Sequence, residues 1–102
     1  MFLLDEFSHK NVAYFPSRIS MKLIDKDEVQ TLIKKGFVTS IKKEYMSLIY
    51  SKELNIEIHY NPISIAMIKN ELAIVGNISK NINNYEEYIK KPIIEWILIK
   101  VY

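Results

Sequence analysis

The sequence predicts an α+β fold, a single domain in which one mixed β-sheet is flanked by short helices. The clearest strand is the run 93–101, which holds five β-branched residues and is apolar on both alternating faces, as expected of an interior strand. The clearest helix is 26–35, where apolar residues recur with helical spacing. Several shorter apolar segments lie between Gly, Pro and Asn residues and supply further strands. We predict that 93–101 is the central strand of the sheet.

The composition fits one intracellular domain spanning 1–102. Lys and Arg number 14 against 12 Asp and Glu, and the resulting net charge of +2 is far from the strongly basic balance of non-specific nucleic-acid binding. The chain has no Cys, which removes disulfides, thiolate nucleophiles and Cys-based zinc sites. Two separated His residues are too few for a metal site, so we expect no metal and no cofactor. The amino-terminal residues do not form a signal peptide, and no apolar run reaches membrane-spanning length, so we expect no contact with a membrane.

The first part of the chain is predicted to supply three strands. Residues 2–7 form a short strand and 8–11 a polar loop, and Pro16 marks a turn at 15–18. A second strand at 19–24 places its odd-numbered apolar residues on one face, and a third follows at 37–41.

Between these strands, the helix 26–35 has clear end signals. Asp25 is suited to be its N-cap, and Glu28 stands at the spacing of a capping box. Gly36 is suited to the left-handed conformation that ends a helix. The boundaries of this helix should therefore be set by local chemistry.

The second part of the chain is predicted to contain more strand than helix. Asn61-Pro62 indicates a turn between two apolar segments, which we interpret as a hairpin. The predicted elements in order are a helix at 42–52, strands at 55–60 and 63–68, a short strand at 72–75, a loop at 81–84, a helix at 85–91 ended by Pro92, and the strand 93–101.

The chain also shows weak internal similarity. Residues 2–24 align with 56–78, and 33–38 align with 89–94. Under one interpretation the chain holds two repeated strand-strand-helix-strand motifs, at 2–41 and 56–101, with a groove for a partner between them. Under the other, two α/β halves of similar size align by chance.

One segment is more specific: Phe7-Ser8, six residues, then Phe-Pro-Ser-Arg-Ile at 15–19. Together with 39–41, 56–58, 70–72 and 95–97, it resembles a small family of proteins found in viruses and plasmids of hyperthermophilic archaea. Some members of that family are ring nucleases, which destroy cyclic tetra-adenylate, the alarm molecule of type III CRISPR immunity. The resemblance implies a viral protein in the host cytoplasm.

The residues that the family uses for catalysis are mostly replaced. A Gly-His pair of the family falls on Lys42 and Lys43, its catalytic Arg on Glu71 and its Glu near Ile74, whereas its loop Ser is kept as Ser8. A lysine with a pKa near 10.4 is a poor general acid or base at neutral pH. An acidic residue repels the phosphate that an Arg would hold. We therefore predict that the protein is not an enzyme and has no ring-nuclease activity.

Two sets of residues remain as candidate binding sites. Ser8, Lys42 and Lys43 are candidate ligands for an anion, although lysines near helix ends are also comfortable in water. The seven Tyr exceed what one small core buries, which favours an interface, and we single out Tyr45 and Tyr60 as partner-binding residues. Tyr rings could instead stack on bases, but such surfaces usually carry more positive charge.

Two further groups have a structural interpretation beside a functional one. His9 and His59 could form an acid–base pair, or be isolated surface residues. Asp25, Asp27 and Glu28 could bind a cation, or simply cap the helix that they begin.

Two functions follow from these observations. The first is a non-catalytic interaction protein, which we expect to be a homodimer and which binds a protein or peptide partner in a groove or at a sheet edge. The second is a protein that binds cyclic oligoadenylate or other nucleic acid without cutting it. Binding to duplex DNA is the least favoured function, because the net charge is only +2.

Overall fold

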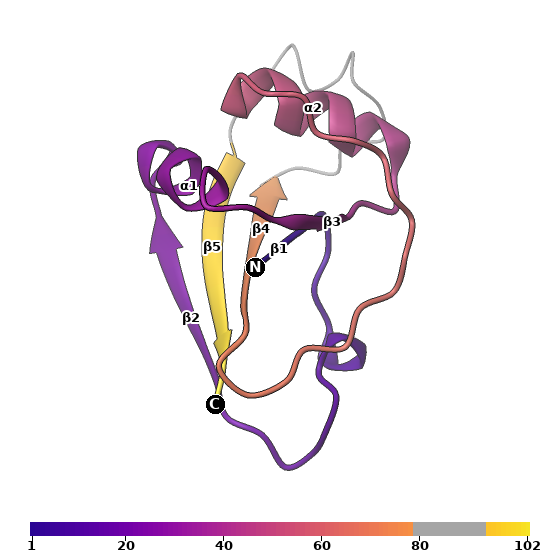
Figure 1. Cartoon of the computed structure of the whole chain (residues 1–102), viewed down its shortest axis with the longest axis vertical. Helices are drawn as coiled ribbons and strands as arrows, with labels where there is room; N and C mark the ends of the chain where they lie inside the picture. Colours follow the sequence, from indigo (N-terminus) through magenta and orange to yellow (C-terminus); the bar gives the residue numbers. More distant parts are fainter. Residues whose placement is uncertain (79–93) are drawn as a thin grey trace.

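The computed structural model describes residues 1–78 and 94–102. The predicted loop 81–84 and helix 85–91 lie outside these residues. The described part forms one mixed sheet of five strands in the order β2-β5-β4-β1-β3 (Figure 1), which confirms the predicted α+β class. The strands are β1 (Phe2–Leu4), β2 (Ile19–Ile24), β3 (Val38–Ser40), β4 (Leu72–Ile78) and β5 (Ile94–Val101).

The sheet has an antiparallel part and a parallel part. β5 pairs antiparallel with both β2 and β4, whereas β1 pairs parallel with β4 and β3. β5 is therefore an interior strand, as predicted, but it is second from an edge, and β4 holds the middle position. Residues 73–76 of β4 are all buried, so the side chains on both faces of this strand are covered. In this sheet, burial on both faces therefore identifies the central strand better than the number of apolar residues in a strand does.

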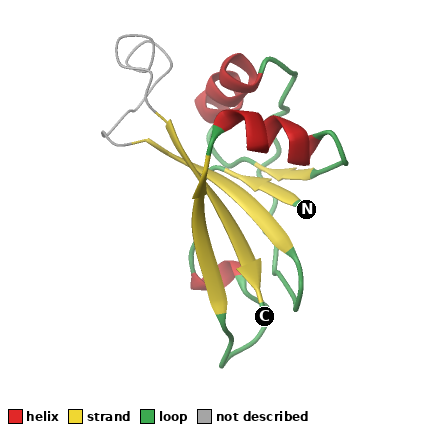
Figure 2. Cartoon of the chain, turned by 90° about the vertical axis from the view of Figure 1, so that its left-hand side faces the viewer, coloured by secondary structure: helices red, strands yellow, loops and turns green. Residues whose placement is uncertain are grey.

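Two helices, α1 (Lys26–Ile33) and α2 (Glu44–Leu54), cover one face of the sheet (Figure 2). The predicted N-cap of α1 is confirmed, because Asp25 Oδ1 accepts a hydrogen bond from the Glu28 amide at 2.8 Å. The predicted end of this helix is wrong by two residues, because α1 ends at Ile33 and a turn at Lys34 and Lys35 follows it. Gly36 comes after this turn and has a φ of 103°, in the left-handed region that favours glycine. α2 begins and ends two residues later than predicted, since the amides of Lys42 and Lys43 are bound to Asp5 instead of entering the helix.

The core between the helices and the sheet is built around aromatic and branched residues. The rings of Tyr50 of α2 and Trp96 of β5 pack in a tilted arrangement, with centroids 4.9 Å apart and an interplanar angle of 56°. Other fully or largely buried members come from both helices and three strands: Leu3, Ile24, Val29, Ile33, Met46, Ile49, Leu54 and Ile74. These residues form the core between the two helices and the sheet.

The other face of the sheet is covered by irregular chain. The short 3-10 helix η1 (His9–Asn11) and the segment 61–68 place Val12, Ile65 and Met67 against the sheet residues Leu4, Ala73, Val75, Ile99 and Val101. The predicted hairpin of 55–60 and 63–68 is wrong. The alternating apolar residues of these segments pack singly over the sheet, and the chain makes only the isolated bridges Val12↔Met67 and Ile41↔Asn61.

Three further predictions, two strands and a loop, differ from the structure in their bounds or content. The strand predicted at 2–7 ends at Leu4, and the one predicted to end before Gly76 continues to Ile78. The polar loop 8–11 contains η1. The internal repeat stays a prediction. Among the described helices none is both long and apolar enough to cross a membrane.

Candidate functional site

The two edges of the sheet differ in how they are protected. At the β3 edge, Asn61 exchanges backbone hydrogen bonds with Ile41, and its side-chain Nδ2 donates to the Thr39 carbonyl at 2.9 Å. At the β2 edge, no described strand pairs with the outer side, and the order of strands in Figure 1 ends there. Of the two edges in the described chain, β2 is the one that presents backbone groups for pairing.

The register shows which backbone groups of β2 point outward. The Tyr102 amide donates to the Arg18 carbonyl at 2.8 Å, immediately before the register pair Ile19↔Val101. Hydrogen-bonded pairs alternate along an antiparallel ladder, so the even-numbered residues of β2 bond to β5. The N–H and C=O groups of Ile19, Met21 and Leu23 therefore point away from the sheet.

The side chains of the same residues form an exposed apolar surface. Met21 is 61% exposed and Leu23 is 66% exposed, on the face of the sheet opposite the helices. Leu23 stands beside Ile97 of β5, which is half-buried and packs with the residues of that face. We call Met21, Leu23 and Ile97 the open face.

A shallow pocket of about 300 Å³ adjoins the open face. Met21 and Ile97 line one side of it, and Asp5, Glu6 and Phe7 line the other. The pocket exists because the chain leaves β4 directly after Leu4, at the end of β1.

Tyr50 explains why β1 ends there. Its hydroxyl donates to the Leu4 carbonyl at 2.7 Å and accepts from the Gly76 amide at 2.8 Å, so it stands where the next β1–β4 ladder bond would form. A Cβ on Gly76 would lie 2.9 Å from the Tyr50 ring, which only glycine allows. Burial raises the pKa of the Tyr50 hydroxyl, which keeps it neutral and able to donate.

A second pocket, of about 430 Å³, brings two of the predicted anion ligands together. Ser8 and Lys42 line it with Lys10 and Ser64, and Lys42 Nζ lies 3.5 Å from Ser64 Oγ. The Ser8 hydroxyl also caps η1, accepting from the Lys10 amide at 3.3 Å. Lys43, the third predicted ligand, is exposed at the start of α2 and is not among the residues that line this pocket.

The backbone next to this pocket already holds an anion. Asp5 Oδ2 accepts from the amides of Lys42 at 3.0 Å and Lys43 at 2.9 Å, at the beginning of α2. These amides and the helix N-terminus would otherwise attract a phosphate. Sequence patterns gave no sign of Asp5, because its partners are distant in the chain.

The remaining predicted residues do not join either pocket as a group. Glu71 accepts from the Ile68 amide at 2.7 Å in the turn before β4, and Ile74 is buried in the core. His59 pairs with exposed Glu57 at 3.8 Å, whereas His9 lies in η1 and lines the pocket of Ser8 and Lys42 without His59. Within the described residues, no group of His, Cys, Asp and Glu could hold a metal ion.

The two tyrosines chosen as partner-binding residues lie in different environments. Tyr45 is half-buried against the helix-side core, and Tyr60 is 46% exposed in the segment after α2. Tyr50, which the sequence gave no reason to single out, is fully buried.

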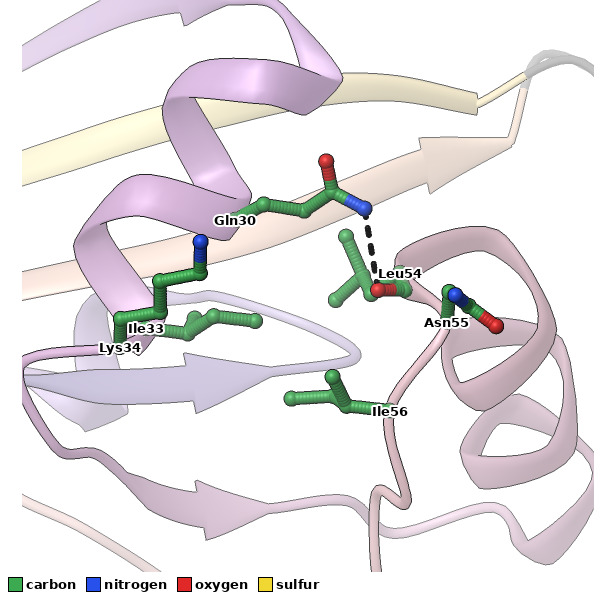
Figure 3. A pocket seen from close by; sticks show the side chains of 6 residues that line it. All are labelled: Gln30, Ile33, Lys34, Leu54, Asn55 and Ile56. Carbon is green, nitrogen blue, oxygen red and sulfur yellow. Dashed lines mark hydrogen bonds between the residues drawn. The ribbon is translucent and has the colours of Figure 1, made fainter.

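A third pocket, of about 290 Å³, lies where the carboxyl ends of α1 and α2 meet (Figure 3). Its walls include Ile33, Leu54 and Ile56. The Gln30 side chain donates to the Leu54 carbonyl at 3.0 Å and thereby ties the two helices together. The Gln30 amide and the Leu54 carbonyl at this pocket are thus bonded to each other within the fold.

The fold and its pockets define a small α+β domain with one unprotected sheet edge. No family model and no curated protein matches the chain. Among solved structures it is similar to B116 of Sulfolobus turreted icosahedral virus, with a TM-score of 0.78, 14% sequence identity and 97% of each chain covered. The chain therefore has the fold of a Sulfolobus virus protein over almost its whole length.

Proposed function

We propose that this protein is a non-catalytic interaction protein of an archaeal virus, and that it binds an extended segment of a partner protein along β2 in the host cytoplasm. The observation that carries the proposal is the outward direction of the Ile19, Met21 and Leu23 backbone groups on the unprotected edge. An extended peptide that adds a strand gains main-chain hydrogen bonds there.

The side chains of β2 support the same function. Native sheets usually protect an edge with charge, proline, a bulge or covering chain. Here the β3 edge is protected by Asn61, whereas β2 carries two exposed apolar side chains and one lysine, Lys22. The apolar residues can contact alternate side chains of an added strand.

The test uses short peptides selected from a random phage-displayed library on the purified protein. Their affinity is then compared for Met21→Pro, which removes an outward N–H while leaving the bonds to β5, and for Met21→Ala, which keeps that N–H. We expect Met21→Pro to weaken binding by about tenfold relative to Met21→Ala, because one main-chain hydrogen bond and the close approach are lost. Equal binding by both variants, or a failure to select any peptide, would contradict the proposal.

A homodimer through β2 is the competing use of the edge. Light scattering on the purified protein distinguishes the two, because a dimer held by β2 would dissociate in Met21→Pro. A monomer that binds peptide favours a foreign partner.

One observation favours a second function. Ser8, Lys42 and Lys10 meet at one pocket, where cyclic oligoadenylate or another nucleic acid could bind without being cut. Titration calorimetry with cyclic tetra-adenylate tests this, with Lys42→Ala as the variant and Lys69→Ala, at an exposed turn, as the control. Binding lost only in Lys42→Ala supports it. The Asp5 carboxylate beside the pocket would repel phosphate, which is why we place this function second.

A further inference from the structure

We infer that the partner segment is positively charged, and that its Lys or Arg side chains lie across the open face toward carboxylates at its border. This inference rests on the proposed function and specifies the chemistry of the partner. It starts from the uneven distribution of charge between the two faces of the sheet.

Strand alternation places acidic and basic side chains on opposite faces. Glu95 has the same parity on β5 as Ile97, so it borders the open face, and it is exposed. Lys22 and Lys100 have the opposite parity and therefore belong to the helix side of the sheet. The charges carried by these two strands thus leave the open face acidic.

The pocket beside the open face adds two more carboxylates. Asp5 and Glu6 line it, and no Lys or Arg is among the described residues that do so. Asp5 Oδ1 is buried and accepts no hydrogen bond from any described residue, whereas Oδ2 accepts two. Part of the negative charge of Asp5 is therefore uncompensated at the pocket wall.

An apolar surface with an acidic border fits a particular type of side chain. The aliphatic stems of Lys and Arg can lie on Met21, Leu23 and Ile97 while the charged ends reach toward Glu6 or Glu95. A segment paired with β2 would direct alternate side chains onto this face. It would carry Lys or Arg beside apolar residues.

The same charges disfavour a second copy on this face. A two-fold contact would place the carboxylates of both copies near one another, and the described residues that line the pocket with Asp5 and Glu6 include no cation to compensate them. Lys26 lies near the other end of the open face, where it lines a pocket with Leu23, but three carboxylates, Asp25, Glu53 and Glu95, line the same pocket. A foreign basic segment meets no such repulsion, so it is the occupant to which we commit.

The test selects phage-displayed random peptides on three proteins: wild type, Glu6→Lys/Glu95→Lys, and the control Glu28→Lys/Glu57→Lys. The control has the same net charge as the test variant and changes two exposed residues, one on α1 and one in the segment after α2. Circular dichroism first verifies that each is folded. We expect Lys and Arg to be enriched in peptides selected on wild type and on the control. Their affinity should fall about tenfold on Glu6→Lys/Glu95→Lys, fall with added salt, and change little on the control.

The outcomes separate this inference from the proposed function. Peptides that need the β2 edge but show no enrichment in Lys or Arg, and no response to Glu6→Lys/Glu95→Lys, would overturn the inference and leave the proposed function standing. A dimer that Leu23→Glu dissociates would also overturn it, because a second copy would then occupy the open face. No selected peptide at all would overturn both.

Discussion

Replacing Tyr50 by Phe should destabilise the fold far more than the loss of one oxygen suggests. The hydroxyl connects the Leu4 carbonyl to the Gly76 amide at 2.7 and 2.8 Å inside the core. Each buried backbone group left without a partner costs about 1–3 kcal/mol, so we expect a loss of about 2–4 kcal/mol in the free energy of unfolding. That is a large share of the roughly 5–15 kcal/mol that typically stabilises a domain.

The assay is guanidinium unfolding followed by the fluorescence of Trp96, the only Trp in the chain, which is 3% exposed beside the Tyr50 ring. Tyr60→Phe is the matched control, because Tyr60 is exposed and its change should stay within about 0.5 kcal/mol. If Tyr50→Phe also changed the free energy of unfolding by less than about 0.5 kcal/mol, the hydroxyl would not be what separates β1 from β4.

Three further predictions concern stability. Gly76→Ala should cost about 2 kcal/mol or more in unfolding free energy, because its Cβ would lie 2.9 Å from the Tyr50 ring; thermal unfolding measures this, and a neutral effect would contradict the close contact. Because the fold raises the pKa of the Tyr50 hydroxyl, the stability that this group contributes should be full below about pH 10 and should decline as the pH rises further. Chemical denaturation across that pH range should show a smaller decline in Tyr50→Phe than in the wild type, and an equal decline in both proteins would contradict this prediction. Asp25→Ala should lose about 1 kcal/mol, since α1 loses its cap, whereas Asp27→Ala should lose less; equal losses in chemical denaturation would deny Asp25 its capping role.

Elements with strong local signals were predictable from the sequence. β2 has the predicted bounds, and α1 begins after the predicted cap because Asp25 and Glu28 interact within one turn of chain. The segments 55–60 and 63–68 show the limit of such reasoning. The alternating apolar residues of these segments are typical of a hairpin, but in the structure they pack over the face of the sheet opposite the helices. Such packing depends on the positions of other strands, which the local sequence does not show.

The candidate site was predictable only in part. Ser8 and Lys42, which were chosen on the family resemblance, line one pocket, whereas Lys43 is not part of its lining, and the role of all three in binding an anion stays a prediction. The alternation at 19–24 correctly placed Met21 and Leu23 on one face. The alternation could not show that Met21 and Leu23 are exposed on that face, because their exposure depends on where segments that are distant in the sequence pack against the sheet.

The most direct measurement of the central claim is amide hydrogen exchange along β2, by NMR, with and without a selected peptide. We predict that the amides of Met21 and Leu23 exchange rapidly in the free protein and become protected when the peptide binds. The Lys22 amide, which the register directs toward β5, should be protected in both states and serves as the internal control. Protection of Met21 and Leu23 in the free protein, or exchange that the bound peptide leaves unchanged, would contradict the account.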